Sequence, residues 1–215
     1  MTRALVFCGA FNPPTLAHIG AAHASMLSSG LEQVVFVPSR AEYIRKSQHK
    51  DFAFGDAQRL ALLKEIAAVH PWMRVSSIEL DMDHQPRTYE TLCRLRDREG
   101  IHGMLLLGSD KLPELEHLWR YVPEMAREFG IACMPRQGED CRAMIQASPF
   151  LTSLGDGLRV LDVDTSAYDG ISSTRVRALL AQMQELSESC AALLPEGAKD
   201  PLSLLRLAQS SPCAE

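Results

Sequence analysis

The sequence predicts a doubly wound α/β domain, in which a parallel sheet carries helices on both faces. Strands and helices alternate along the chain, and the strands are short, continuous apolar runs. Such runs are typical of strands that are buried on both faces of a parallel sheet. The 215 residues suit one large domain with at most a small extension. We expect that domain over residues 1–195 and a tail, partly helical or frayed, over residues 196–215.

The first forty residues predict a βαβ unit. Residues 4–8 form an apolar strand that ends at Gly9, and residues 34–37 form a second, β-branched strand. Between them, Leu16–Ser29 is predicted to be a helix. The apolar residues expected near one face of this helix are Leu16, Ile19, Ala22, Met26 and Leu27. This spacing implies a parallel sheet with a right-handed crossover.

The alternation continues toward the end of the chain. Residues 39–53 are predicted to form a largely polar and basic loop. Further helices are expected at residues 54–69, Thr88–Glu99 and 172–184. Further strands are expected at residues 74–80, 104–107, Ile131–Met134 and 158–163. In the helix at residues 54–69, Leu60, Leu63 and Ala67 are expected on one side, and residues 210–215 are expected to fray.

Composition excludes several classes of protein. The formal net charge of −5 makes a duplex nucleic acid a poor partner, because its binding rests on many phosphate contacts. The six cysteines are scattered without a zinc-like spacing, so we expect reduced thiols. The sequence holds neither a signal-peptide core nor an apolar run long enough to span a membrane. We therefore expect a cytoplasmic protein without membrane or nucleic-acid partners, and leave open a homo-oligomer.

The first segment that points to chemistry is the string GAFNPPTLAH, from Gly9 to His18. It lies between the first strand and the first helix, where Thr15 is a good N-cap and His18 projects from the same turn. Free N–H groups and the helix dipole make this a phosphate site. A lone histidine here would more often be a solvated residue in an ordinary turn, but the whole string favours phosphate binding.

The second segment is GISSTRVR, from Gly170 to Arg177, after the last predicted strand. Ser172 or Ser173 is expected to cap a new helix. Hydroxyls, free N–H groups and two arginines converge within about one turn, as a triphosphate requires. The alternative is a capping motif on an ordinary solvated helix.

Together, the two strings resemble the nicotinamide/nicotinate mononucleotide adenylyltransferases, in a superfamily with (H/T)xxH and ISSTxxR motifs. Thr15 and His18 match the first motif, and Ser172, Ser173, Thr174 and Arg177 match the second. The resemblance extends over about residues 4–195 and implies a Rossmann-like fold. Two positions depart from the pattern: Ala17 stands where many members have glycine, and Tyr89 stands where tryptophan is usual.

Weaker segments extend the resemblance in order along the chain. They are Lys46 in the basic loop, Thr88 and Tyr89 in a TWESL-like segment, Gly108 and Asp110 in GSD, and Trp119 and Arg120 in LWR. The resemblance implies catalytic roles for His18, Thr15 and Lys46. It implies ATP binding by Gly9, Ala10, Phe11, His18, Gly108, Asp110, Ile171, Ser172, Ser173, Thr174 and Arg177. It implies pyridine-nucleotide binding by Asn12, Lys46, Thr88, Tyr89, Trp119 and Arg120, with the rings of Tyr89 and Trp119 stacking on the pyridine.

The resemblance implies transfer of AMP from ATP to nicotinate or nicotinamide mononucleotide, which gives a dinucleotide of the NAD type and pyrophosphate. The mononucleotide phosphate would attack directly, without a covalent intermediate. Mg²⁺ would be needed, held by phosphate oxygens and water rather than by protein ligands. The alternatives are a phosphopantetheine adenylyltransferase, a cytidylyltransferase, or a catalytically silent nucleotide-binding regulator. The motifs do not distinguish nicotinate from nicotinamide.

Overall fold

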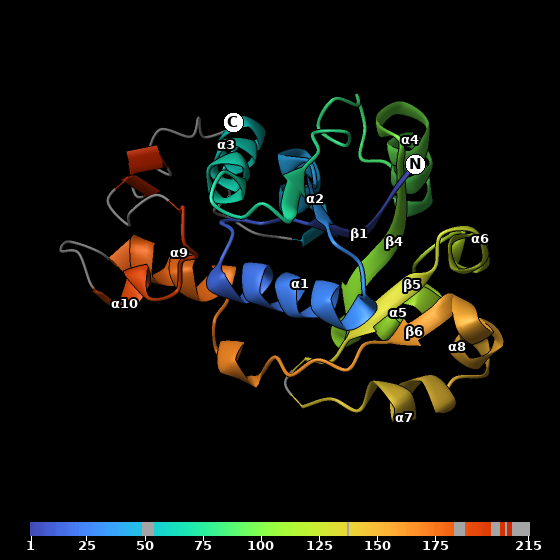
Figure 1. The fold of residues 1–215 in the computed structure, drawn as a ribbon. Helices are drawn as coiled ribbons and strands as arrows, with labels where there is room; N and C mark the ends of the chain where they lie inside the picture. The colour runs from blue at the N-terminus through green and yellow to red at the C-terminus, as the bar shows by residue number, and fades with distance from the viewer. Residues whose placement is uncertain (49–53, 137, 183–187, 199–202, 205, 208–215) are drawn as a thin grey trace. The chain divides into compact units, whose positions relative to one another are not determined.

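A computed structural model describes residues 1–215 except 49–53, 137, 183–187, 199–202, 205 and 208–215 (Figure 1). The strands are β1 (Thr2–Gly9), β2 (Val34–Pro38), β3 (Met73–Val75), β4 (Ile101–Gly108), β5 (Ile131–Met134) and β6 (Leu158–Val160). The helices are α1 (Leu16–Ser29), α2 (Ala41–Gln48), α3 (Asp56–Ala67), α4 (Thr88–Glu99), α5 (Leu112–His117), α6 (Val122–Glu128), α7 (Cys141–Gln146), α8 (Pro149–Ser153), α9 (Ser173–Gln182) and α10 (Glu188–Ala191). The expected fraying of residues 210–215 lies outside the described residues.

The strands form one six-stranded sheet in the order β3-β2-β1-β4-β5-β6. The neighbouring pairs β1–β4, β4–β5 and β5–β6 are parallel, with Leu5 opposite Met104 and Leu106 opposite Ala132. This is the strand order of a Rossmann-like doubly wound sheet, so the predicted fold class is confirmed. The chain order reverses between β1 and β4, and ligands of such sheets bind beyond the carboxyl ends of the strands at that point.

The chain divides into two compact units. The first unit consists of Met1–Cys8, Gly20–Val35 and Pro86–Asp169. The second unit consists of Gly9–Ile19, Phe36–Gln85 and Gly170–Glu215. The expected domain boundary at residue 195 stays a prediction.

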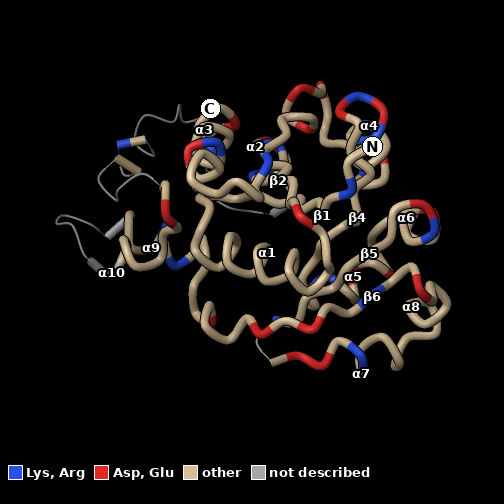
Figure 2. Tube along the Cα trace, in the orientation of Figure 1, with Lys and Arg blue, Asp and Glu red and all other residues tan. Residues whose placement is uncertain are grey.

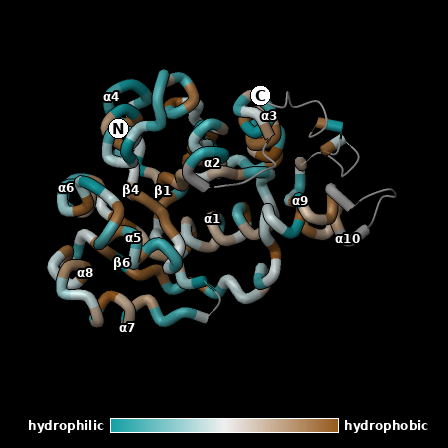
Figure 3. Tube along the Cα trace, turned by 180° about the vertical axis from the view of Figure 1, so that it is seen from behind, coloured by the Kyte–Doolittle hydropathy of each residue, from teal (hydrophilic) through white to brown (hydrophobic). Residues whose placement is uncertain are grey.

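The first unit has an apolar core built on β4 and β5. Ile101, Leu105 and Ile131 are almost fully buried, and α4 packs against β4. Lysine, arginine, aspartate and glutamate are absent from both strands and gather on the surrounding helices and loops (Figure 2). The apolar residues of β4 are seen from behind in Figure 3. Burial on both faces explains why these strands are continuous apolar runs.

The second unit has its own apolar cluster between α3 and α9. Its buried members are Phe54, Leu62, Val176, Leu180, Cys190, Leu193 and Leu204. Three described residues that follow α9 in the sequence, Cys190, Leu193 and Leu204, therefore pack in the same cluster as residues of α3 and α9. Leu193 also accepts a hydrogen bond through its carbonyl from the N–H of Leu16, at 2.9 Å. This contact satisfies one of the N–H groups that a helix N-terminus leaves unpaired.

The predicted loop at residues 39–53 is wrong in its first part, because Ala41–Gln48 forms helix α2. The apolar side chains of Ala41 and Ile44 are buried, and Lys46 pairs with Glu42 one helical turn away. The backbone N–H of Ala41 donates to the carboxylate of Asp56 at 2.6 Å. The basic composition of this segment concealed a short amphipathic helix. His49 and Lys50 of the predicted loop lie outside the described residues.

Other predicted boundaries are too long. The strand expected at residues 74–80 is only β3, because Ser77 turns the chain through hydrogen bonds with the N–H groups of Leu80 and Asp81. The hydroxyl of Ser76 also accepts a hydrogen bond from the N–H of Ile78, and local side-chain bonds of this kind compete with a strand ladder. The last strand ends at Val160 rather than at residue 163, and Leu27 of α1 is exposed rather than on the buried face.

Candidate active site

The turn between β1 and α1 contacts the buried residues Phe36 and Ser39 of the second unit. The carbonyl of Gly9 accepts a hydrogen bond from the N–H of Ser39, at 2.9 Å. Phe11 is 1% exposed, and its ring packs against the ring of Phe36 with centroids 5.4 Å apart. An added Cβ at Gly9 would lie 3.2 Å from the ring of Phe11, which is tighter than ordinary contact. The ring of Phe11 therefore leaves little room for a side chain at position 9, which explains a glycine there.

Thr15 and His18 contact each other at the beginning of α1. The hydroxyl Oγ1 of Thr15 lies 2.7 Å from Nδ1 of His18, and the backbone N–H of Thr15 donates to the same nitrogen at 3.2 Å. Because a backbone N–H can only donate, Nδ1 accepts, and the neutral imidazole carries its proton on Nε2. The edge of the ring also meets Phe11, with centroids 5.3 Å apart. His18 therefore presents a fixed Nε2–H donor.

The beginning of α9 is capped as the sequence predicts. The hydroxyl of Ser172 accepts a hydrogen bond from the N–H of Arg175, at 3.1 Å, so Ser172 is the N-cap. The side chain of Ile171 packs against the apolar cluster of the second unit. The hydroxyl of Ser173 donates to the carbonyl of Pro13, at 2.7 Å.

Arg177 joins the two predicted phosphate segments. Its Nη1 donates to the carbonyl of Asn12 at 2.7 Å, and its Nη2 donates to the hydroxyl of Thr174 at 3.2 Å. Burial lowers the pKa of Arg177, but a guanidinium remains charged at neutral pH. With the contact of Ser173, these bonds bring the (H/T)xxH and ISSTxxR segments together within one compact unit.

The side chain of Asn12 is buried and forms a hydrogen bond within the second unit. Its side chain is 1% exposed, and its Oδ1 accepts a hydrogen bond from the N–H of Phe54, at 2.8 Å. The turn is thereby tied to the segment that leads into α3.

Lys46 lies on α2, and its side chain is 76% exposed. Its Nζ forms an ion pair with Glu42 at 2.7 Å, and this contact lowers the pKa of the Glu42 carboxyl. An exposed pair of this kind contributes little to stability and separates readily. Lys46 is therefore able to turn toward a phosphate ligand.

The residues predicted to bind the pyridine ring lie in the first unit. Tyr89, next to Thr88 in the first turn of α4, donates its hydroxyl to Glu128 at 2.8 Å and packs against the ring of Tyr121 at 5.6 Å. The carboxylate of Glu128 is the largest of the effects that raise the pKa of Tyr89 to about 12. Trp119 donates from Nε1 to Glu114 at 3.4 Å, and Arg120 follows it on the exposed surface.

The GSD segment of the first unit is surrounded by charged groups. Asp110 lies 3.4 Å from Nη1 of Arg136 and 3.9 Å from Nζ of Lys111. Ser109 is fully buried and hydrogen-bonds both to the carboxylate of Glu139 and to the N–H of Arg136. Gly108 is the last residue of β4 and Arg136 lies two residues after the end of β5, at the edge where parallel sheets bind ligands.

Comparison with known proteins identifies the family. The model of the family described as Cytidylyltransferase-like matches residues 6–179. A protein of Herpetosiphon aurantiacus named "Probable nicotinate-nucleotide adenylyltransferase" is 31% identical over 172 residues, which cover 79% of this chain and 84% of that protein. A protein of Neisseria meningitidis with the same name is 31% identical over 84% of this chain and 88% of its own length.

The chain belongs to the cytidylyltransferase-like family and, within it, to the nicotinate-nucleotide adenylyltransferases. A "Nicotinamide/nicotinic acid mononucleotide adenylyltransferase 2" of Caenorhabditis elegans is 25% identical over 86% of this chain and 90% of its own length. The solved nicotinic acid mononucleotide adenylyltransferase of Plasmodium falciparum, complexed with APC, superposes with a TM-score of 0.71 at 14% identity, covering 97% of this chain and 98% of that chain. The last match bears on the fold, which it shares.

The adenylyltransferase has no described helix that is both long and apolar enough to cross a bilayer. The described residues also contain no group of three or more His, Cys, Asp or Glu side chains arranged to hold a metal ion. The five described cysteines are not joined in disulfide bonds, and burial raises the pKa of Cys133 and of Cys141.

Sequence reasoning missed candidate residues in each of the two units of this adenylyltransferase. In the first unit it missed Arg136, although this residue follows strand Ile131–Met134 as Asp110 follows the preceding strand. Applying the strand-end rule to β5 would have found it. In the second unit it missed Arg59 and Asp56, whose roles depend on carbonyl groups that no sequence pattern marks.

Gly108→Ala is expected to raise KM for ATP about tenfold, the scale of a small misplacement of binding groups. An added Cβ would lie 2.5 Å from both Cδ of Arg136 and Oδ1 of Asp110, so these two side chains must move. Steady-state kinetics checks this. Gly55→Ala is the control, since an added Cβ there meets no atom closer than Oε1 of Gln58 at 3.6 Å. Equal KM values in the two variants would contradict a role for the Gly108 segment.

Proposed function

We propose that this adenylyltransferase transfers AMP from ATP to nicotinate or nicotinamide mononucleotide through direct in-line attack of the mononucleotide phosphate on the α-phosphorus. A new P–O bond forms, the bond to the β-phosphate oxygen breaks, and pyrophosphate leaves with that electron pair. The attacking phosphate is already ionised at neutral pH and needs no general base. The observation that carries the proposal is the pair of hydrogen bonds from Ser173 and Arg177 to the turn that precedes His18.

In this reaction the chain contributes positioned donors. His18 donates from Nε2 to an α-phosphate oxygen. The tautomer supports this role, because Nδ1 accepts from the N–H of Thr15 and the proton of the neutral ring is therefore already on Nε2. Ser172, Thr174 and Arg177 hold the β- and γ-phosphates, with the N–H groups of α9 beside them. Preorganised donors of this kind stabilise charge that develops in the transition state.

We also propose that the reaction requires Mg²⁺, which would bind together with ATP. The side chains gathered around the two segments are hydroxyl, imidazole and guanidinium groups, which are not the carboxylates that Mg²⁺ prefers. They fit a Mg²⁺ ion that takes its ligands from phosphate oxygens and water. When bound, the ion neutralises charge on the triphosphate.

The pyridine mononucleotide is proposed to use Thr88, Tyr89, Trp119 and Arg120 of the first unit. The hydrogen bond of Tyr89 to Glu128 holds its hydroxyl and the ring of Tyr121 packs beside it, which limits the movement of a ring proposed to stack on a flat ligand. The names of the bacterial relatives favour nicotinate over nicotinamide mononucleotide. We also propose a cytoplasmic location, where ATP and mononucleotides are available.

A product assay tests the proposed function. The protein is incubated with Mg-ATP and, in separate reactions, with nicotinate mononucleotide, nicotinamide mononucleotide or phosphopantetheine, and with CTP in place of ATP. Dinucleotide and pyrophosphate in equal amounts are expected with a pyridine mononucleotide. Product only with phosphopantetheine or only with CTP would assign another activity of the superfamily. ATP binding without pyrophosphate release would indicate a silent regulator.

Lys46→Ala is expected to lower kcat/KM for the mononucleotide at least about tenfold, because one mobile cation is removed from the bound phosphates. The melting temperature should change little, since the ion pair with Glu42 is exposed. Glu42→Gln is the matched control, because it removes the partner and leaves Lys46 in place. A loss shared equally by both variants would point to helix α2 rather than to Lys46.

A further inference from the structure

A buried arginine lies beneath the loops of the second unit. Arg59, on α3, has 0% exposure and is the largest fully buried side chain of the described residues. A buried guanidinium is costly unless its donors are matched by acceptors. An apolar residue of similar size would serve for packing alone, so the contacts of Arg59 require a reason.

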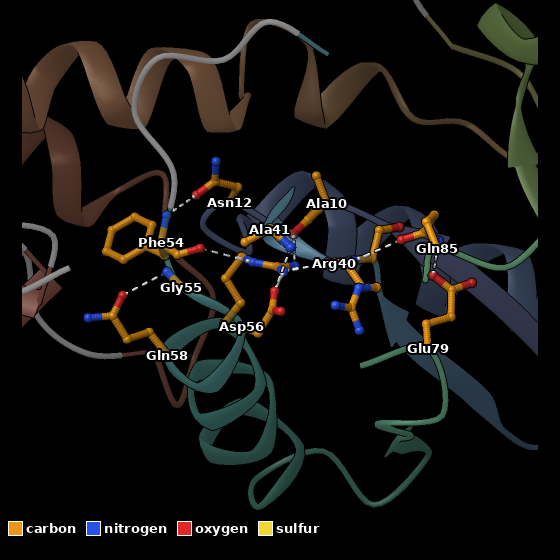
Figure 4. Close-up of polar contacts among 12 residues, drawn as sticks. Ala10, Asn12, Arg40, Ala41, Phe54, Gly55, Asp56, Gln58, Glu79 and Gln85 are labelled. Carbon is orange, nitrogen blue, oxygen red and sulfur yellow. Dashed lines mark hydrogen bonds and ion pairs between the residues drawn. The ribbon is translucent and has the colours of Figure 1, made fainter. Parts of the chain in front are cut away.

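The guanidinium of Arg59 donates to four acceptors, three of which (Ala10, Phe54 and Asp56) are labelled in Figure 4. Nη1 donates to the carbonyl of Ala10 at 2.7 Å, and Nε donates to the carbonyl of Phe54 at 3.1 Å. Nη2 donates to the carbonyl of Ser39 and to the carboxylate of Asp56. Arg59 therefore binds the turn after β1, the turn after β2 and the segment before α3.

Two of these acceptors, Ala10 and Ser39, lie on segments that carry residues proposed to act on the nucleotides. Ala10 precedes Phe11, whose ring contacts His18. Ser39 leads into α2, which carries Lys46. A shift of either carbonyl would therefore be passed to a group that contacts phosphate.

The same network extends to the remaining phosphate segment. Asp56 accepts from the N–H of Ala41 as well as from Arg59, which joins α2 to α3. The N–H of Phe54 donates to Oδ1 of Asn12, whose carbonyl accepts from Arg177. Hydrogen bonds therefore link the buried guanidinium of Arg59 to three segments: the turn after β1, helix α2 and the beginning of α9.

The charge of Arg59 is retained in this environment. Burial lowers the pKa of Arg59, whereas the carboxylates of Asp56 and Glu79 oppose that effect. Glu79 is itself buried and accepts from Gln85, whose Oε1 accepts from the N–H of Arg40. Lysine would bring the same charge, but its ammonium is a single point that lacks the planar fork.

We propose that Arg59 is a positioning residue for AMP transfer, which sets the carbonyls of Ala10 and Ser39 and thereby the placement of His18 and Lys46 against the triphosphate. This inference rests on the proposed function. It gives Arg59 a role in activity that does not require contact with the substrate, since its side chain is fully buried.

Arg59→Lys and Arg59→Met test the inference with Mg-ATP and nicotinate mononucleotide. We expect Arg59→Met to lower kcat about 100-fold and to raise KM for ATP about tenfold, as misplacement of reacting groups by about 1 Å does. Arg59→Lys should fall between this variant and the wild type, because it keeps the charge and part of the bonding. KM does not depend on the fraction of enzyme that is folded, so a change in KM separates positioning from loss of folded protein.

Leu63→Ala is the matched control. Leu63 lies on the same helix with 0% exposure, so its truncation lowers stability but removes no hydrogen bond to the loops, because a leucine side chain has no polar atom. KM for ATP should stay at the wild-type value in this variant. The inference is overturned if both Arg59 variants keep the kcat and KM of Leu63→Ala, or if neither variant folds, which would leave Arg59 a role in stability alone. Absence of dinucleotide with the wild type would instead remove the proposed function.

Discussion

Replacing His18 by alanine is expected to lower kcat by a factor of about 100 to 1,000, the cost of losing one preorganised donor to a developing charge. The two contacts at Nδ1, from the backbone N–H and the hydroxyl of Thr15, leave the proton of the neutral ring on Nε2. Alanine removes that donor and leaves the helix intact, because alanine is the best helix former. Single-turnover measurement of dinucleotide formation checks the result.

Two comparisons sharpen the His18 experiment. Thr15→Ala deletes the hydroxyl contact but keeps the backbone donor to Nδ1, so we expect a smaller loss of about tenfold. His23→Ala removes another histidine of α1 and should leave kcat near the wild-type value. A folded His18→Ala variant that loses less than about tenfold would reject the assigned role.

Arg177→Ala is expected to lower kcat/KM for ATP by a factor of about 100 or more, because in its proposed role this partly buried guanidinium makes charge-assisted bonds to phosphate. Arg177→Lys should recover little of this loss. A lysine cannot bond to the carbonyl of Asn12 and the hydroxyl of Thr174 with the same fork. Steady-state kinetics with varied ATP measures the effect.

Arg175→Ala is the control for Arg177. Arg175 lies on the same turn of α9, but it is exposed and its Nη1 donates to the carbonyl of Gly170. Its loss should change kcat/KM for ATP little. Equal losses in the two variants would indicate that the helix responds to total positive charge rather than to a positioned guanidinium.

Elements with strong periodicity could be predicted from the sequence. The bounds of Leu16–Ser29, Thr88–Glu99 and Ile131–Met134 agree with the structure. Each has an apolar pattern with a clear stop, such as Gly30 after the first helix or Gly100 after the second. A serine cap, by Ser172 or Ser173, was also predictable, because a serine hydroxyl accepts from the N–H groups that a helix start leaves unpaired; the structure assigns the cap to Ser172.

Features that depend on long-range contacts could not be predicted. Helix α2 is amphipathic for only two turns, and its first N–H is satisfied by Asp56, fifteen residues away. The buried face of α3 was predicted as Leu60, Leu63 and Ala67, but the structure buries Arg59, Leu62, Leu63 and Ile66. A sequence pattern predicts an arginine to be exposed, so the burial of Arg59 became apparent only from the acceptors that surround it in the structure.

The roles of the site residues stay predictions, and the structure shows which of these residues lie together. The contact between the His18 turn and the ISSTxxR segment gives the phosphate residues a common setting in one unit. Tyr89 and Trp119 each have a defined polar partner, and their stacking on a pyridine ring stays a prediction.

A crystal structure with Mg²⁺ and a non-hydrolysable ATP analogue tests the central claim most directly. The claim predicts Nε2 of His18 within about 3 Å of an α-phosphate oxygen, and the guanidinium of Arg177 at the β- or γ-phosphate of the same molecule. A triphosphate that contacts neither residue, or only one of the two segments, would contradict it.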